Sequence, residues 1–187
     1  MPSNDSSERI TQTQPKIAGY PDLAIHEEKV LIVVKTYPHP SKKYKEIVCT
    51  AGVTENGKWI RLYPIDYRYL EYAKWYKKYQ WINVKIEKKS DDFRTDSYKP
   101  DTDSIKTLGE SLDTKKSWEK RKNIILPTVK FNSLEEIEDS YKKDGISLGI
   151  FKPKIIEDLV MEADSEEWSD THKKVLSQLV LFGEQPK

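Results

Sequence analysis

The stretch EIVCTAGVTENGKWIRLYP, from Glu46 to Pro64, decides the fold. Two runs of alternating apolar residues flank Asn56-Gly57, and Asn-Gly is a strong short-range signal of a β-hairpin. We therefore expect a strand over residues 46–53 to pair antiparallel with a strand over residues 58–64. Because side chains alternate along a strand, one face of the second strand carries three large residues: Trp59, Arg61 and Tyr63.

Further strands are expected on both sides of this hairpin. Residues 29–35 are apolar on both faces, as in a central strand, and residues 81–89 alternate cleanly. Residues 66–80, which precede the second of these strands, are predicted to form a helix with Asp66 as its N-cap. Residues 36–44 contain two prolines, which lack the amide that a sheet needs, and are predicted to form a basic, aromatic loop.

The second half of the chain has a mixed pattern. Ser133-Leu-Glu-Glu136 matches a capping box and predicts a helix that ends near Lys143, before Asp144-Gly145. The other expected elements are a short strand or turn over 104–108, a helix over 111–121, an edge strand over 123–131, strands over 147–151 and 154–160, and a helix over 169–181.

Charge is distributed unevenly along the chain. Residues 29–89 hold 14 Lys/Arg against five Asp/Glu, an excess of +9, although the whole chain carries only +1. Residues 131–187 hold seven basic and 13 acidic residues, a balance of −6. We expect a mainly β protein with short helices, divided into a flexible polar tail (1–27), a basic OB-like barrel lobe (28–108) and a second, acidic lobe (109–187) that is either α+β or OB-like.

The positive stretch is interleaved with nine aromatic residues between Trp59 and Trp81. Cations hold a phosphate backbone and flat rings stack on bases, so the mixture predicts a non-catalytic module for single-stranded nucleic acid or oligonucleotides. Aromatic residues at such spacings are also typical of a core; both readings stay open for the 59/61/63 face, whereas packing is favoured for Tyr69, Tyr72 and Tyr76. The expected binding residues are Lys35, Tyr37, Lys42, Lys43, Arg61, Tyr63, Arg68, Arg94 and Tyr98.

Four segments together resemble a known family. They are KTYPHPSKKY (35–44), VCTAG (48–52), KWIRLYPI (58–65) and DFRTDSY (92–98), and they resemble a family of uncharacterised prokaryotic proteins with a dual OB-containing domain. This resemblance implies two small OB-like barrels, the first over residues 28–108 and the second in the remainder. By analogy with OB-folds it also implies binding of single-stranded nucleic acid. It supplies no catalytic residues.

Other functional classes receive less support. One Cys and three scattered His do not make a zinc site, and no glycine-rich phosphate loop is present, so we expect neither a cofactor nor a bound metal. Asp91, Asp92 and Asp96 beside a basic lobe leave a metal-dependent nuclease as an alternative. The acidic residues 131–187 leave a protein-interaction module as another. Without a long apolar run or a secretory h-region, we expect a cytoplasmic protein with no membrane partner.

Overall fold

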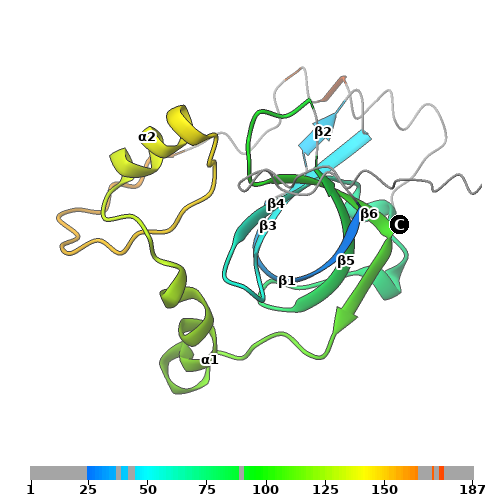
Figure 1. The fold of residues 1–187 in the computed structure, drawn as a ribbon, viewed down its shortest axis with the longest axis horizontal. Helices are drawn as coiled ribbons and strands as arrows, with labels where there is room; N and C mark the ends of the chain where they lie inside the picture. The colour runs from blue at the N-terminus through cyan, green and yellow to red at the C-terminus, as the bar shows by residue number, and fades with distance from the viewer. Residues whose placement is uncertain are drawn as a thin grey trace, which may run out of the picture.

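The computed structural model describes residues 25–36, 39–41, 45–88, 91–163, 170, 173 and 174. Within residues 25–108 the chain forms one sheet that closes on itself (Figure 1). Its strands are β1 (His26–Lys35), β2 (His39–Ser41), β3 (Lys45–Thr54), β4 (Trp59–Ile65), β5 (Trp81–Lys88) and β6 (Ser97–Leu108).

Five of these strands, within residues 26–108, make a closed ring in the order β1, β3, β4, β6, β5 and back to β1. We call these five strands the ring. The pairing of β4 with β6 is parallel, and the other pairings in the ring are antiparallel. Strand β2 lies outside the ring and pairs with the first residues of β3.

The predicted hairpin is confirmed. Val53 of β3 pairs with Trp59 of β4, and the amide of Thr54 donates to the carbonyl of Lys58 at 2.8 Å. Gly57 has a φ of 76°, a left-handed conformation that glycine adopts without steric cost. The strand expected over residues 81–89 is also present as β5, whereas the short strand or turn expected near residue 104 is the end of the longer β6.

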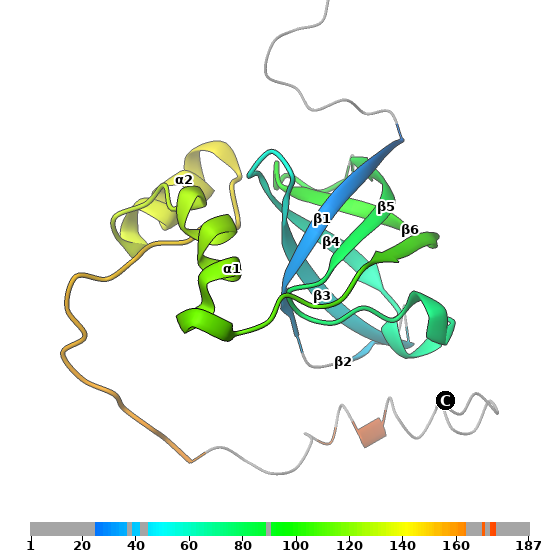
Figure 2. The same ribbon diagram turned by 90° about the horizontal axis from the view of Figure 1, so that it is seen from below.

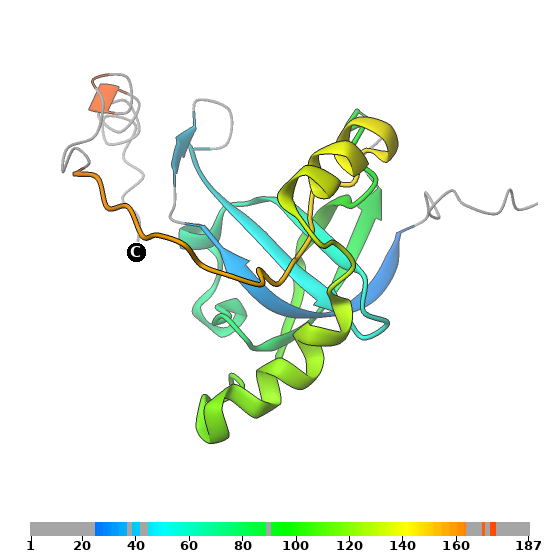
Figure 3. The same ribbon diagram turned by 90° about the vertical axis from the view of Figure 1, so that its left-hand side faces the viewer.

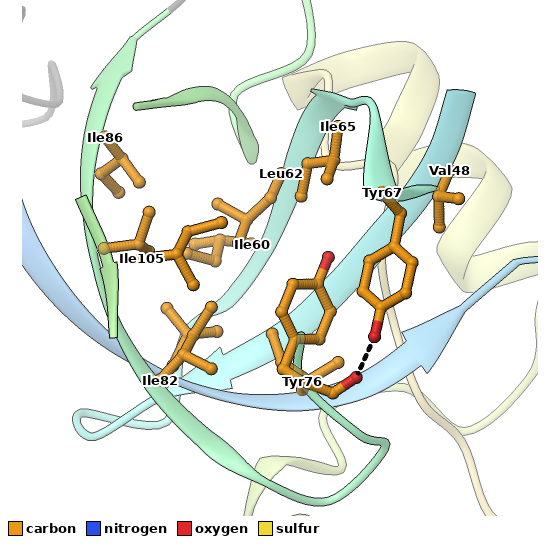
Figure 4. Packing of buried hydrophobic residues seen from close by; sticks show 12 residues of the cluster. Val48, Ile60, Leu62, Ile65, Tyr67, Tyr76, Ile82, Ile86 and Ile105 are labelled. Carbon is orange, nitrogen blue, oxygen red and sulfur yellow. Dashed lines mark hydrogen bonds between the residues drawn. The ribbon is translucent and has the colours of Figure 1, made fainter. Parts of the chain in front are cut away.

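The core fills the ring, and two tyrosines lie in it beside the apolar side chains (Figure 4). Isoleucine, valine and leucine side chains from all five ring strands point inward. Tyr76 is buried there, and its hydroxyl forms a hydrogen bond of 2.9 Å with Oγ1 of Thr50. The hydroxyl of Tyr67 donates to the carbonyl of Tyr76 at 2.8 Å, and the two rings meet edge to face. Packing of Tyr76, as favoured from sequence, is confirmed.

The single helix predicted over residues 66–80 is wrong. This segment contains two 3₁₀ turns, η1 (Tyr67–Tyr69) and η2 (Tyr72–Lys74), joined by extended backbone at Leu70. The rings of Tyr67 and Tyr76 have centroids 5.1 Å apart. Nine residues of α-helix would separate their backbones by about 13.5 Å along the axis, so the segment bends and brings the two rings together in the core.

Two helices, α1 (Lys115–Ile125) and α2 (Leu134–Asp144), are present in residues 109–163, with a 3₁₀ turn, η3 (Leu126–Thr128), between them. Both lie outside the ring on the same side of it, and Figure 3 shows α2 in front of the strands on that side (Figures 1, 2 and 3). Helix α2 confirms the prediction at both ends: Oγ of Ser133 accepts from the amide of Glu136, and Gly145 is left-handed with φ 67°. None of the described helices is both long and apolar enough to cross a membrane.

The prediction of two barrel-like lobes is wrong, because the described residues form a single sheet. The edge strand predicted over residues 123–131 is also wrong, because residues 123–128 belong to the end of α1 and to η3, and Phe131 forms only an isolated bridge. The amides of Ser147 and Leu148 donate to the carboxylate of Asp96, so they are not available to a strand partner, and residues 147–151 contribute only a bridge between Phe151 and Phe131 within the described chain. Residues 154–160 are exposed and do not form the predicted strand. The helix expected over residues 169–181 lies almost wholly outside the described residues.

Candidate nucleic-acid interface

The structure places the predicted binding residues at different points around the ring. Lys35 ends β1, Arg61 and Tyr63 lie on β4, Arg94 lies in the segment between β5 and β6, and Tyr98 is on β6. Tyr37, Lys42 and Lys43, and the side chain of Arg68, lie outside the described part of the molecule.

Arg61 and Arg94, 33 positions apart in the sequence, line one cleft. This arginine cleft, of about 340 Å³, is bounded by the two arginines and by Ile137, Glu138, Tyr141, Ile146 and Ser147. Nη2 of Arg61 donates to Oγ of Ser147 at 3.2 Å, whereas its Nε is buried without a hydrogen-bond partner among the described residues. Arg61 is therefore half-buried, because residues after α2 pack over β4.

Arg94 is fixed by a carboxylate two residues before it. Its Nε and Nη2 donate to the two carboxylate oxygens of Asp92 at 2.8 and 2.7 Å, a bidentate pair, and its backbone amide donates to the same group at 3.1 Å. These hydrogen bonds hold the pKa of Asp92 well below its usual range and raise the pKa of Arg94. The pair orients the guanidinium in the wall of the arginine cleft.

Asp96 ties the ring to the segment after α2. Its carboxylate accepts hydrogen bonds from the amide of Ser147 (2.6 Å), the hydroxyl of Ser147 (2.8 Å) and the amide of Leu148 (2.7 Å). The side chain is buried, with 8% of its surface exposed. Asp92 and Asp96 thus serve different partners, and no group of three metal-ligating side chains occurs in the described part of the chain. This geometry lends no support to the nuclease alternative.

The other predicted residues are partly occupied by internal contacts. The ammonium of Lys35 lies 3.1 Å from the ring centroid of Tyr67, and burial together with the charge of Lys78 lowers the pKa of Lys35 to about 8. Tyr98 packs against the core, with the ammonium of Lys88 5.1 Å from its ring. Burial raises the pKa of the Tyr98 hydroxyl.

Part of the positive charge counted in residues 29–89 is neutralised within the fold. Lys29 pairs with Glu55 at 2.7 Å, and Lys74 pairs with Asp103 at 3.1 Å. Trp59 is half-buried, and its indole N–H donates to Oγ1 of Thr128 at 3.0 Å. Of the tyrosines expected to pack with Tyr76, Tyr69 and Tyr72 are exposed.

Sequence reasoning missed Tyr141 and Ser147, which complete the arginine cleft. Ser147 lies 86 positions from Arg61, with which it shares a hydrogen bond, and no periodicity connects the two. The capping box of α2 was the local signal that fixed the position of Tyr141 on a helix, but it did not indicate which surface that helix covers.

Comparison with models of protein families matches residues 26–127 to the one described as Domain of unknown function (DUF8758). The match spans more than half of the chain. The chain belongs to this family. The DUF8758 match includes every described strand of the ring and the four segments on which the sequence resemblance rested. No curated protein and no solved structure matches the chain.

Proposed function

We propose that this DUF8758 protein binds single-stranded nucleic acid, without catalysis, across the outer surface of β3 and β4. The observation that carries the proposal is the convergence of Arg61 and Arg94 in the arginine cleft on that surface. Two guanidinium groups in one cleft suit phosphate, because each carries five N–H donors and keeps some of them beyond those bound to Asp92 or Ser147.

The order of the ring strands supports the same surface. In an OB-fold barrel, the second and third strands and the loops after the first and fourth strands bind oligonucleotides. Here the second and third ring strands are β3 and β4. The corresponding connections are residues 36–44, where the structure has the short strand β2 and not the loop expected from the sequence, and residues 89–96, which include Arg94. Tyr37, Lys42 and Lys43 belong to the first of these connections in the sequence. We therefore interpret the ring as a single OB-like barrel.

Fluorescence anisotropy with a labelled 20-mer of single-stranded DNA or RNA, at two salt concentrations, tests the proposal. Phosphate contacts release counterions, so affinity must fall as salt rises. Arg61→Ala should weaken binding and lower the salt slope by about one, whereas Lys106→Ala, which removes an exposed charge from β6, should change neither. Binding that is undetectable at micromolar protein, or that does not respond to salt, would refute the proposal.

A thermal melt separates binding from packing at Tyr63. Tyr63 is half-buried on the same face of β4 as Arg61. If its ring stacks on a base, Tyr63→Ala should weaken binding by about 1–3 kcal/mol with little change in the melt. If the ring mainly packs against the protein, the free energy of unfolding should fall by an amount closer to the roughly 3–5 kcal/mol typical of a truncated core aromatic.

One observation favours a second function, binding of a protein partner. Residues 155–161 expose five large apolar side chains, each with 72–87% of its surface accessible: Ile155, Ile156, Leu159, Val160 and Met161. Acidic Glu157, Asp158 and Glu162 lie among and beside them, which suits an apolar groove with a basic rim. Recovery of one stoichiometric partner by the wild-type chain after nuclease treatment, and its loss in Leu159→Ser, would support this function. Recovery of the same partner by Leu159→Ser would contradict it.

A further inference from the structure

A second cleft, of about 450 Å³, lies between the ring and the segment that follows α1. One wall comes from the beginnings of β4 and β6, and the other comes from residues 128–131 and 146–149. The residues that matter for its chemistry are Lys58, Trp59, Tyr98, Lys130, Phe131 and Leu148. We call it the aromatic cleft. The second wall lies beyond the residues matched to the DUF8758 family.

Hydrogen bonds between the two walls fix their positions relative to each other. The indole of Trp59 bonds to Thr128, and the carboxylate of Asp96 bonds to Ser147 and Leu148. Gly149 leaves room for the ring of Phe131, because a Cβ at position 149 would lie 2.7 Å from a ring carbon. A site whose walls are fixed in this way loses little conformational entropy when it binds.

The lining of the aromatic cleft combines flat rings with cations. Trp59, Tyr98 and Phe131 supply aromatic surface from three separate parts of the chain. Lys58 and Lys130 are exposed, and neither forms an ion pair with any described residue. The carboxylate that also lines the cleft, Asp96, already accepts three hydrogen bonds, so it does not compete for these cations. The chemistry suits a flat aromatic group joined to an anion.

We propose that the aromatic cleft binds one nucleoside 5′-monophosphate. Its base packs against the rings of Trp59, Tyr98 and Phe131, and its phosphate lies at Lys58 and Lys130. The volume is within the range of clefts that bind small molecules, roughly 300–1,000 Å³. The nucleotide is either free or the terminal residue of a strand. The aromatic cleft adjoins the arginine cleft, and Ile146 lines both.

Titration of AMP, GMP, CMP and UMP into the full-length protein, followed by calorimetry and by the NMR signal of the Trp59 indole N–H, tests the proposal. We expect saturable binding of at least one nucleotide, with a shift of that signal. Lys130→Glu should weaken binding by about tenfold or more, because a charge-assisted hydrogen bond is replaced by repulsion. Phe131→Ala should also weaken it. Lys106→Glu and Tyr72→Ala, which alter an exposed charge and an exposed ring elsewhere, should leave it unchanged.

Further measurements distinguish a free nucleotide from the end of a strand, and binding in the aromatic cleft from binding in the arginine cleft. The matching nucleoside without phosphate should bind more weakly than the nucleotide and should be insensitive to Lys130→Glu. An oligonucleotide that ends in a 5′-phosphate should displace the nucleotide if the natural ligand is a strand terminus, and should leave it bound if the ligand is free nucleotide. Binding of AMP that persists in Arg61→Ala would show that this site is independent of the arginine cleft. Absence of binding by all four nucleotides at millimolar concentration, or binding that Lys130→Glu leaves intact, would overturn the proposal.

Discussion

Replacement of Asp96 by alanine should release the segment after α2 while leaving the ring folded. The carboxylate of Asp96 accepts two backbone amides and one hydroxyl from Ser147 and Leu148, at 2.6–2.8 Å. Hydrogen bonds to a charged group contribute about 1.5–3 kcal/mol each. Taking the lower value for the two amides gives roughly 3 kcal/mol, which is about a hundredfold increase in the population of the open segment. The loss of stability is confined to this segment, because water forms hydrogen bonds with the freed amides once the segment opens.

Hydrogen exchange measured by NMR gives the direct test. The amides of Ser147 and Leu148 should exchange about a hundredfold faster in Asp96→Ala, while the amide of Ile82, within β5, should be unchanged. Asp91→Ala is the matched control, because Asp91 is an exposed carboxylate that lies, like Asp96, between β5 and β6. If exchange at Leu148 stays within about threefold of the wild-type rate, Asp96 does not hold the segment and the reasoning is wrong.

Further predictions concern stability, measured by urea denaturation. Tyr76→Phe should cost about 1–2 kcal/mol, because Oγ1 of Thr50 loses its buried partner, whereas Tyr72→Phe, at an exposed position, should cost almost nothing; equal losses would contradict this. Burial lowers the pKa of Lys35 to about 8, so the unfolded chain binds more protons between about pH 8 and 10.4 and stability should rise over that window. A rise that persists in Lys35→Met would have another source. The lowered pKa of Asp92 stabilises the fold above about pH 4 and this contribution is lost as the pH falls further; the difference between wild type and Asp92→Asn should therefore shrink from pH 7 to about pH 3. A constant difference would argue against the pair with Arg94.

The first half of the chain was predictable because its signals are local. The turn at Asn56-Gly57 and the alternation along β4 and β5 require no knowledge of the rest of the molecule, and both predictions are confirmed. The segment from Asp66 to Gln80 was mispredicted because Tyr67 and Tyr76 both pack in the core. Their rings come into contact only if the helix is interrupted. A tertiary requirement there overrides the helical spacing of the tyrosines.

The second half was less predictable, since its conformation depends on contacts with the ring. The alternating apolar residues near Ser147 indicate a strand, but the nearest acceptor for its amide is Asp96, 51 positions earlier. For the candidate site, residue types indicated Arg61 and Arg94, and the structure brings them together. Their partners Ser147 and Asp92 could not be assigned from the sequence. Ser147 is distant from Arg61 along the chain, and the residues around Asp92 are equally compatible with a solvated acidic turn and with an ion pair.

The closure of the ring has a consequence for how the chain folds during synthesis. Closure requires β1 to meet β5, with His26 opposite Ile86, and requires β6, which ends at Leu108, to fill the place between β4 and β5. Until that strand leaves the ribosome, β4 and β5 each present an open edge, and open edges invite pairing with other chains. Contacts this distant in sequence also slow folding relative to helical proteins of the same size. Nascent chains shorter than about 108 residues are therefore the stage at which this protein most needs protection from aggregation.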